Sequence, residues 1–193
     1  MKNTIKITAL VAVLAAFTLG AKAQTNPTST KTSTGIRYSI GVDAGIPTGK
    51  LADRAKWNLG GSVQADIPVA TQLFVTVNAG YNNIFAKDIT VGTSVIKGTD
   101  IQLIPVKAGL KYFPAGNFYV QAQAGAAFVL NKADVGANNS VVFAYAPQLG
   151  YQFPVCGTNF IDAGVRYEGT TKLNSAISDS KLNFVALRVA YGF

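Results

Sequence analysis

Nine charged residues stand at alternate positions in segments where every second residue is apolar. They are Arg37, Asp43, Asp66, Lys107, Lys111, Asp162, Arg166, Glu168 and Arg188. An alternating segment is a strand with two different faces, so the charges share the face opposite the apolar one. A charge that turns away from water must pair with an opposite charge or change its protonation. The four acids and five bases therefore predict an enclosed network of ion pairs, and the functional alternative is a narrow path for ions.

Residue types that usually perform catalysis or bind metals are scarce in the chain. Its 193 residues include no His, one Cys and one Met. Because His is the commonest general base and metal ligand, we expect no catalytic, cofactor-binding or metal site. Cys156 has no second cysteine to pair with, which predicts an unpaired thiol. The net charge of +8 comes without a basic cluster interleaved with aromatics, so we expect no nucleic-acid partner.

Eight alternating segments must position the nine charges. They cover residues 37–46, 57–67, 73–82, 104–112, 118–130, 141–153, 161–168 and 185–193. Most have 10 to 14 residues, whereas soluble strands usually have about 5–6 and a tilted membrane strand needs about 9–11. The chain is 49% hydrophobic and 13% charged, with its apolar residues spread over every second position. We therefore predict an all-β fold, an eight-stranded antiparallel up-and-down transmembrane β-barrel over residues 34–193.

The polar face decides between a membrane barrel and a soluble one. A lipocalin-like barrel also has eight strands, but it has an apolar interior and a polar exterior. Here the polar face is rich in Gly, Ala, Ser, Asn and Gln, and the whole chain has one Glu, which suits a crowded interior. The apolar face carries aromatics near both ends of the segments, as at membrane interfaces. They are Tyr38, Trp57, Tyr81, Tyr112, Phe118, Phe128, Phe143, Phe153, Tyr167, Tyr191 and Phe193.

The connections between segments alternate in length. Short turns are predicted at 68–72, 113–117 and 154–159, and longer loops at 47–56, 84–99, 131–140 and 169–180. The 84–99 loop is predicted to contain a hairpin that extends beyond the barrel. Pro105 and Pro147 fall within strands, and the apolar phase slips between Leu103 and Ile104, so we predict bulges. Asp43 and Arg188 are expected to meet where the first and last strands join.

The N-terminal segment has the pattern of an export signal. Lys2 and Lys6 precede an apolar run at 7–19, and residues 21–23 (AKA) fit a small-x-small cleavage pattern. We predict a cleaved signal peptide at 1–23, with a membrane anchor as the alternative, although the run is too short to span a bilayer comfortably. Residues 24–33 are predicted to be a flexible leader, or alternatively a glycosylated stalk. Cleavage would lower the net charge from +8 to +5.

The last strand has apolar residues at every second position up to a terminal Phe193. Here the sequence resembles the eight-stranded outer-membrane barrels typified by OmpX and the transmembrane domain of OmpA, most of all the compact forms of Bacteroidota. Residues 103–106 (LIPV) and 109–113 (GLKYF) look like the fourth strand and turn of that group. The resemblance implies that Tyr191 and Phe193 form the signal read by the barrel-assembly machinery. No peptidoglycan-binding domain is expected after the barrel.

The resemblance also bears on function. Enzymes built on small membrane barrels, such as lipid A deacylases, palmitoyltransferases and proteases, depend on a His, so we expect no enzymatic activity from this chain. We expect a Gram-negative outer-membrane protein with a plugged polar lumen and a structural or surface-interaction role. Loop lysines would meet membrane lipids, lipopolysaccharide or an extracellular ligand. The alternatives are a narrow, porin-like channel for small solutes and a soluble periplasmic ligand-binding barrel.

Overall fold

The computed structural model describes residues 35–91, 94–174 and 180–193. The signal peptide predicted at 1–23 and the leader predicted at 24–33 lie outside the described residues. Within the described ranges, no helix has both the length and the apolar character needed to cross a membrane.

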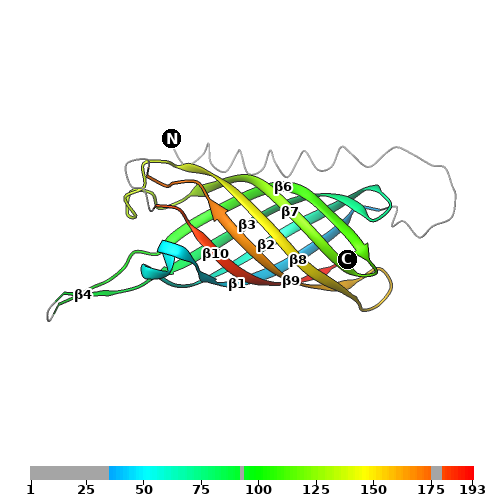
Figure 1. The fold of residues 1–193 in the computed structure, drawn as a ribbon, viewed down its shortest axis with the longest axis horizontal. Coiled ribbons are helices and arrows are strands. Elements are labelled where there is room, and N and C mark those ends of the chain that lie inside the picture. The colour runs from blue at the N-terminus through cyan, green and yellow to red at the C-terminus, as the bar shows by residue number, and fades with distance from the viewer. Residues whose placement is uncertain (1–34, 92–93, 175–179) are drawn as a thin grey trace. The chain divides into compact units, whose positions relative to one another are not determined.

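Eight long strands form a closed antiparallel barrel, as the sequence predicts. They are β1 (Arg37–Pro47), β2 (Ala55–Ala70), β3 (Leu73–Ala86), β6 (Ile101–Ala115), β7 (Phe118–Val129), β8 (Val141–Pro154), β9 (Phe160–Thr170) and β10 (Asn183–Gly192). Each strand pairs with its neighbours along the chain, and β1 pairs with β10 to close the ring (Figure 1). At the closure, the backbones of Tyr38 and Phe193 exchange two hydrogen bonds of 3.1 and 2.9 Å.

The two ends of the barrel differ in the length of their connections. Three tight turns join β2 to β3, β6 to β7 and β8 to β9 at one end, which we call the turn rim. The other end, the loop rim, carries the 3-10 helix η2 (Gly49–Asp53) and the longer connections. The predicted hairpin is confirmed, because β4 (Ile89–Val91) pairs with β5 (Ser94–Ile96) outside the barrel sheet (Figure 1).

Side chains alternate between the outer wall and the lumen along every barrel strand. Large apolar residues of the outer wall are exposed, for example by 58% at Ile40, 59% at Val42 and 56% at Leu187. The polar residues between them are buried in the lumen, among them Asp43 and Arg188. A lipocalin-like barrel has the opposite arrangement. The predicted assignment of the apolar face to the outside is therefore confirmed.

The predicted bulges at Pro105 and Pro147 are wrong. Pro105 pairs with Ala127 and Pro147 pairs with Ala122 in uninterrupted ladders to β7. Each proline also faces a second neighbouring strand, which is β3 for Pro105 and β9 for Pro147. In these two ladders, two consecutive residue pairs around the proline are missing, and the pairing then resumes in the same register. A proline lacks one N–H, so it removes hydrogen bonds toward one neighbour without inserting a residue. The apolar phase slip at Leu103 has another cause: this residue points inward and is 2% exposed.

Candidate functional site

Lumen side chains form successive layers between the two rims. At the turn rim, the Arg37 guanidinium lies 4.2, 5.2 and 5.5 Å from the ring centroids of Phe74, Phe160 and Phe113. Cations stack favourably on aromatic faces at such distances. These four residues come from β1, β3, β6 and β9, so the turn-rim layer draws on strands from around the ring.

A first charged cluster, the turn-side cluster, follows above this layer and consists of Asp66, Lys111 and Asp162. Lys111 Nζ lies 2.7 Å from Asp66 and 3.6 Å from Asp162. The Tyr119 hydroxyl donates a 2.6 Å hydrogen bond to Asp162, and Gln152 donates one of 2.9 Å to the same carboxylate. Two carboxylates therefore surround one buried ammonium, and their remaining oxygens have donors of their own.

A second charged cluster, the loop-side cluster, contains the other five predicted charges: Asp43, Lys107, Arg166, Glu168 and Arg188. Asp43 lies 3.2 Å from Arg188 and 3.3 Å from Arg166. Lys107 pairs with Glu168, and all five side chains are at most 7% exposed. Ser62 accepts a hydrogen bond from Arg188 and donates one of 3.1 Å to Asp43.

Some of these bonds cross the lumen. Lys107 and Lys111 lie on β6, whereas Glu168 and Asp162 lie on β9, and β7 and β8 separate those strands in the ring. The clusters are also linked, because Gln148 accepts a 2.8 Å hydrogen bond from Arg166 and donates one to the Tyr119 hydroxyl. Direct bonds between non-neighbouring strands leave the middle of the lumen occupied by side chains.

An apolar cluster closes the lumen at the loop rim. We call it the loop-rim cluster; its buried members are Leu51, Ala55, Ile84, Leu103, Ala127, Val129, Val142, Ala144, Leu173, Leu182, Phe184 and Ala186. Leu51 comes from η2 and is 6% exposed, so the first long loop folds back over the barrel mouth. This cluster explains why Leu103 points inward. It also explains why the apolar phase slips there without a bulge.

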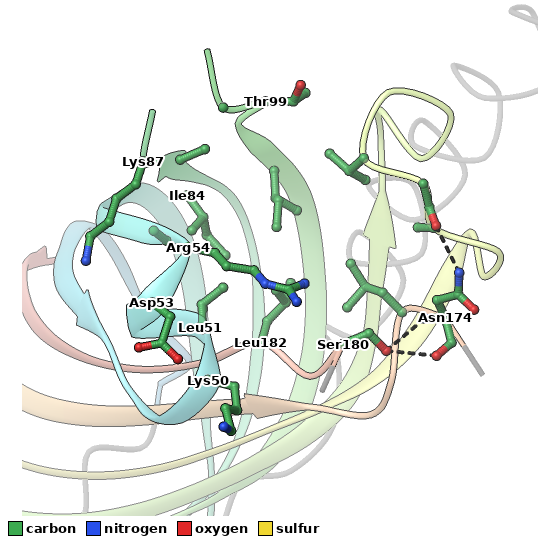
Figure 2. A pocket seen from close by; sticks show the side chains of 18 of the residues that line it. Lys50, Leu51, Asp53, Arg54, Ile84, Lys87, Thr99, Asn174, Ser180 and Leu182 are labelled. Atoms are coloured by element: carbon green, nitrogen blue, oxygen red, sulfur yellow. Dashed lines mark hydrogen bonds between the residues drawn. The ribbon is translucent and has the colours of Figure 1, made fainter. Parts of the chain in front are cut away.

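A pocket of about 780 Å³ lies above the loop-rim cluster. Its apolar lining includes Leu51, Ile84 and Leu182, and charged residues from several loops surround it (Figure 2). The Arg54 side chain points into the pocket, whereas Lys50 and Lys87 point away from its centre (Figure 2). The described residues contain no group of three or more His, Cys, Asp or Glu side chains placed to hold a metal ion.

The structure places all nine predicted charges inside the barrel and brings eight of them into the two clusters. The ninth, Arg37, lies between the turn-side cluster and the aromatic rings. Tyr191 and Phe193 lie on the outer wall, 44% and 56% exposed. Sequence reasoning missed the loop-rim cluster and the pocket. The apolar residues of the loops, such as Leu51 and Leu173, were the available signal, but they follow no periodic pattern.

The chain was compared with protein families, curated proteins and solved structures, and the matches are to solved structures. No family model matches the sequence, and no curated protein matches it. The outer membrane protein Ail of Yersinia pestis, solved in a phospholipid bilayer nanodisc, is 18% identical, with 81% of this chain and 99% of that chain covered and a TM-score of 0.53. Neisserial surface protein A is 19% identical, with coverages of 82% and 96% and a TM-score of 0.51. At this identity the likeness shows the fold, which is that of small transmembrane β-barrels.

Proposed function

We propose that the protein is an integral outer-membrane β-barrel whose lumen is filled and whose surface loops carry its role in binding or cell-surface structure. The observation that carries the proposal is the combination of an apolar outer wall with bonds across the lumen. The Lys107–Glu168 pair joins non-neighbouring strands, and apolar or aromatic layers lie beyond the charges at both rims. Such a barrel is stable in lipid and does not hold a continuous aqueous path.

The orientation follows from the two rims. In outer-membrane barrels, short turns face the periplasm and longer loops face outward. The loop rim with η2 and the β4–β5 hairpin would then lie outside the cell, where its lysines can meet lipopolysaccharide or an extracellular ligand. Export would use the signal peptide proposed at 1–23, and assembly would use the terminal Tyr191 and Phe193. We further propose that the protein resembles OmpX and the compact barrels of Bacteroidota, and that it has no enzymatic activity.

A narrow channel is the second candidate function, and one observation favours it. Asn78 is 1% exposed in the lumen, and neither its amide nitrogen nor its carbonyl oxygen has a hydrogen-bond partner in the described part of the chain. A buried amide without partners is a site where water or a polar solute would be favourable. Passage would still require displacement of the loop-rim cluster and of the turn-rim layer.

The unique thiol provides a test of location and orientation. Cys156 is exposed in the turn between β8 and β9. In intact cells, a polymer-linked maleimide that cannot cross the outer membrane should leave Cys156 unlabelled, and permeabilised cells should give labelling. In the matched variant C156S/K132C, whose thiol lies in the β7–β8 loop, intact cells should be labelled. Labelling of Cys156 in intact cells, or recovery of the protein from the periplasm without detergent, would overturn the proposal.

A further inference from the structure

The loop-rim pocket combines an apolar floor with a guanidinium directed into it. Leu51, Ile84 and Leu182 form part of the floor, and all three belong to the buried loop-rim cluster. Half-buried Ile101 and Val135 add apolar surface to its lining. A volume of about 780 Å³ lies within the roughly 300–1,000 Å³ of typical small-molecule sites, which are mostly apolar with a few polar groups that fix orientation.

Most charged groups around the pocket already have partners or point elsewhere. Asp88 forms a 3.3 Å ion pair with Lys56 and accepts a hydrogen bond from the Gly98 backbone. Lys87 donates a 2.7 Å hydrogen bond to the Ala52 carbonyl. Figure 2 shows the Lys50 and Asp53 side chains directed away from the centre of the pocket.

Arg54 differs from these groups. It follows η2 directly, and its exposed side chain points into the pocket (Figure 2). Within residues 35–91, 94–174 and 180–193, its guanidinium forms neither an ion pair nor a side-chain hydrogen bond. A guanidinium presents five donors in a planar fork that matches a carboxylate or a phosphate. The pocket therefore offers an unpaired anion-binding group next to apolar surface.

We propose that this pocket binds an amphipathic anion, an alkyl chain with a carboxylate or phosphate head group. The head group would accept hydrogen bonds from Arg54, and the alkyl chain would lie against Leu51, Ile84 and Leu182. Burial of the chain on this floor supplies the apolar part of the affinity, and the charge-assisted hydrogen bonds supply the orientation. The inference rests on the proposed function, because it needs the loop rim to be accessible and the lumen below to be filled.

The apolar floor of the pocket separates a bound ligand from the lumen of the barrel. The same apolar cluster that lines the pocket also closes the lumen, and the loop-side charges lie beneath it. A bound alkyl chain therefore has no open path into the barrel. The site would retain its ligand at the cell surface, as expected for a receptor or a binding protein.

Calorimetric titration of the full chain in lipid nanodiscs tests the proposal, with empty nanodiscs as the blank. The probes are octanoate, octyl phosphate and octan-1-ol, which share a chain length and differ in the head group. Octanoate and octyl phosphate should bind saturably and more tightly than octan-1-ol, and the tighter of the two identifies the head group. Arg54→Gln should weaken octanoate binding by about tenfold or more, since it removes a charge-assisted bidentate contact. Lys132→Gln, which removes a loop cation outside the pocket lining, should bind like the parent protein.

The outcomes that overturn the proposal are distinct. If octanoate and octyl phosphate both gave heats equal to those of empty nanodiscs, or if their affinities were equal in Arg54→Gln and the parent, the site would be excluded. Octan-1-ol that binds as tightly as both anions would exclude the role of the anionic head group. If only the pocket proposal is wrong, the labelling of Cys156 and of the K132C thiol stays as expected above. If the proposed location is wrong, that labelling pattern changes whether or not octanoate binds.

Discussion

Asp43 and Arg188 are direct cross-strand partners in the β1–β10 pair that closes the barrel, and their side chains form a 3.2 Å ion pair. The two residues are 145 positions apart in the sequence. Their proximity is the one lumen contact that the sequence predicted residue by residue. It was predictable because an up-and-down barrel must join its first strand to its last.

Replacement of Asp43 tests how strongly this carboxylate stabilises the closure. Asp43→Asn leaves both Arg166 and Arg188 buried without their shared counter-charge, and we expect a loss of about 3–5 kcal/mol in the free energy of unfolding. Urea unfolding in lipid vesicles measures the loss. Asp53→Asn, which changes an exposed loop carboxylate, is the matched control and should stay within about 0.5 kcal/mol of the parent. A loss in Asp43→Asn no larger than the control's would contradict the closure's dependence on this pair.

The Lys107–Glu168 pair tests whether a bond across the lumen is required or replaceable. Glu168→Gln leaves a fully buried ammonium without its carboxylate, and a loss of about 3–5 kcal/mol is expected. The double variant K107M/E168L removes both charges, keeps side-chain volume and leaves the Arg166–Asp43 pair in place, so it should be more stable than the single variant. A double variant as unstable as Glu168→Gln would show that the pair does not act as a unit.

The inner wall contains a glycine that makes room for an aromatic ring. Gly150 is the cross-strand partner of Tyr119, and a Cβ at this position would overlap the tyrosine ring. Gly150→Ala should therefore displace Tyr119 from Asp162 and cost about 1–3 kcal/mol in urea unfolding. Gly61→Ala is the matched control, because a Cβ there would meet only one atom at 3.7 Å. Equal stability of the two variants would contradict the packing described for Tyr119.

The β4–β5 hairpin carries a pH-dependent contact at its base. The Gly98 backbone N–H, followed by the Lys56 ammonium, lowers the pKa of Asp88 below its usual value. Because the pKa is lowered in the folded protein, the contact stabilises the hairpin above the ordinary Asp pKa of about 3.9 and is lost as the pH falls through the folded value. An NMR titration of the Asp88 carboxyl carbon should give a midpoint below 3.9. A midpoint at or above about 3.9 would contradict this arrangement.

Periodicity predicted the barrel, the two faces and the set of charges in the lumen, because the side-chain period of a strand is a local property. It did not predict which charges pair, since the position of Lys107 relative to Glu168 depends on the register of the three strand pairings that connect β6 to β9 through β7 and β8. The bulge prediction at Pro105 failed because a ladder can skip hydrogen bonds without changing register. The sequence did not predict that Leu51 closes the lumen or that Arg54 lines the pocket. Irregular loops have no side-chain period from which the direction of a side chain could be inferred.

The filled lumen is the central claim, and planar-bilayer conductance of the purified full-length protein tests it most directly. Co-flotation of the same preparation with lipid vesicles establishes that the protein inserts. Side chains that bridge β6 and β9, together with the layers at both rims, predict a membrane current that stays at the level of the protein-free bilayer. Steady unitary current steps from the inserted protein would contradict the claim and would favour the narrow channel.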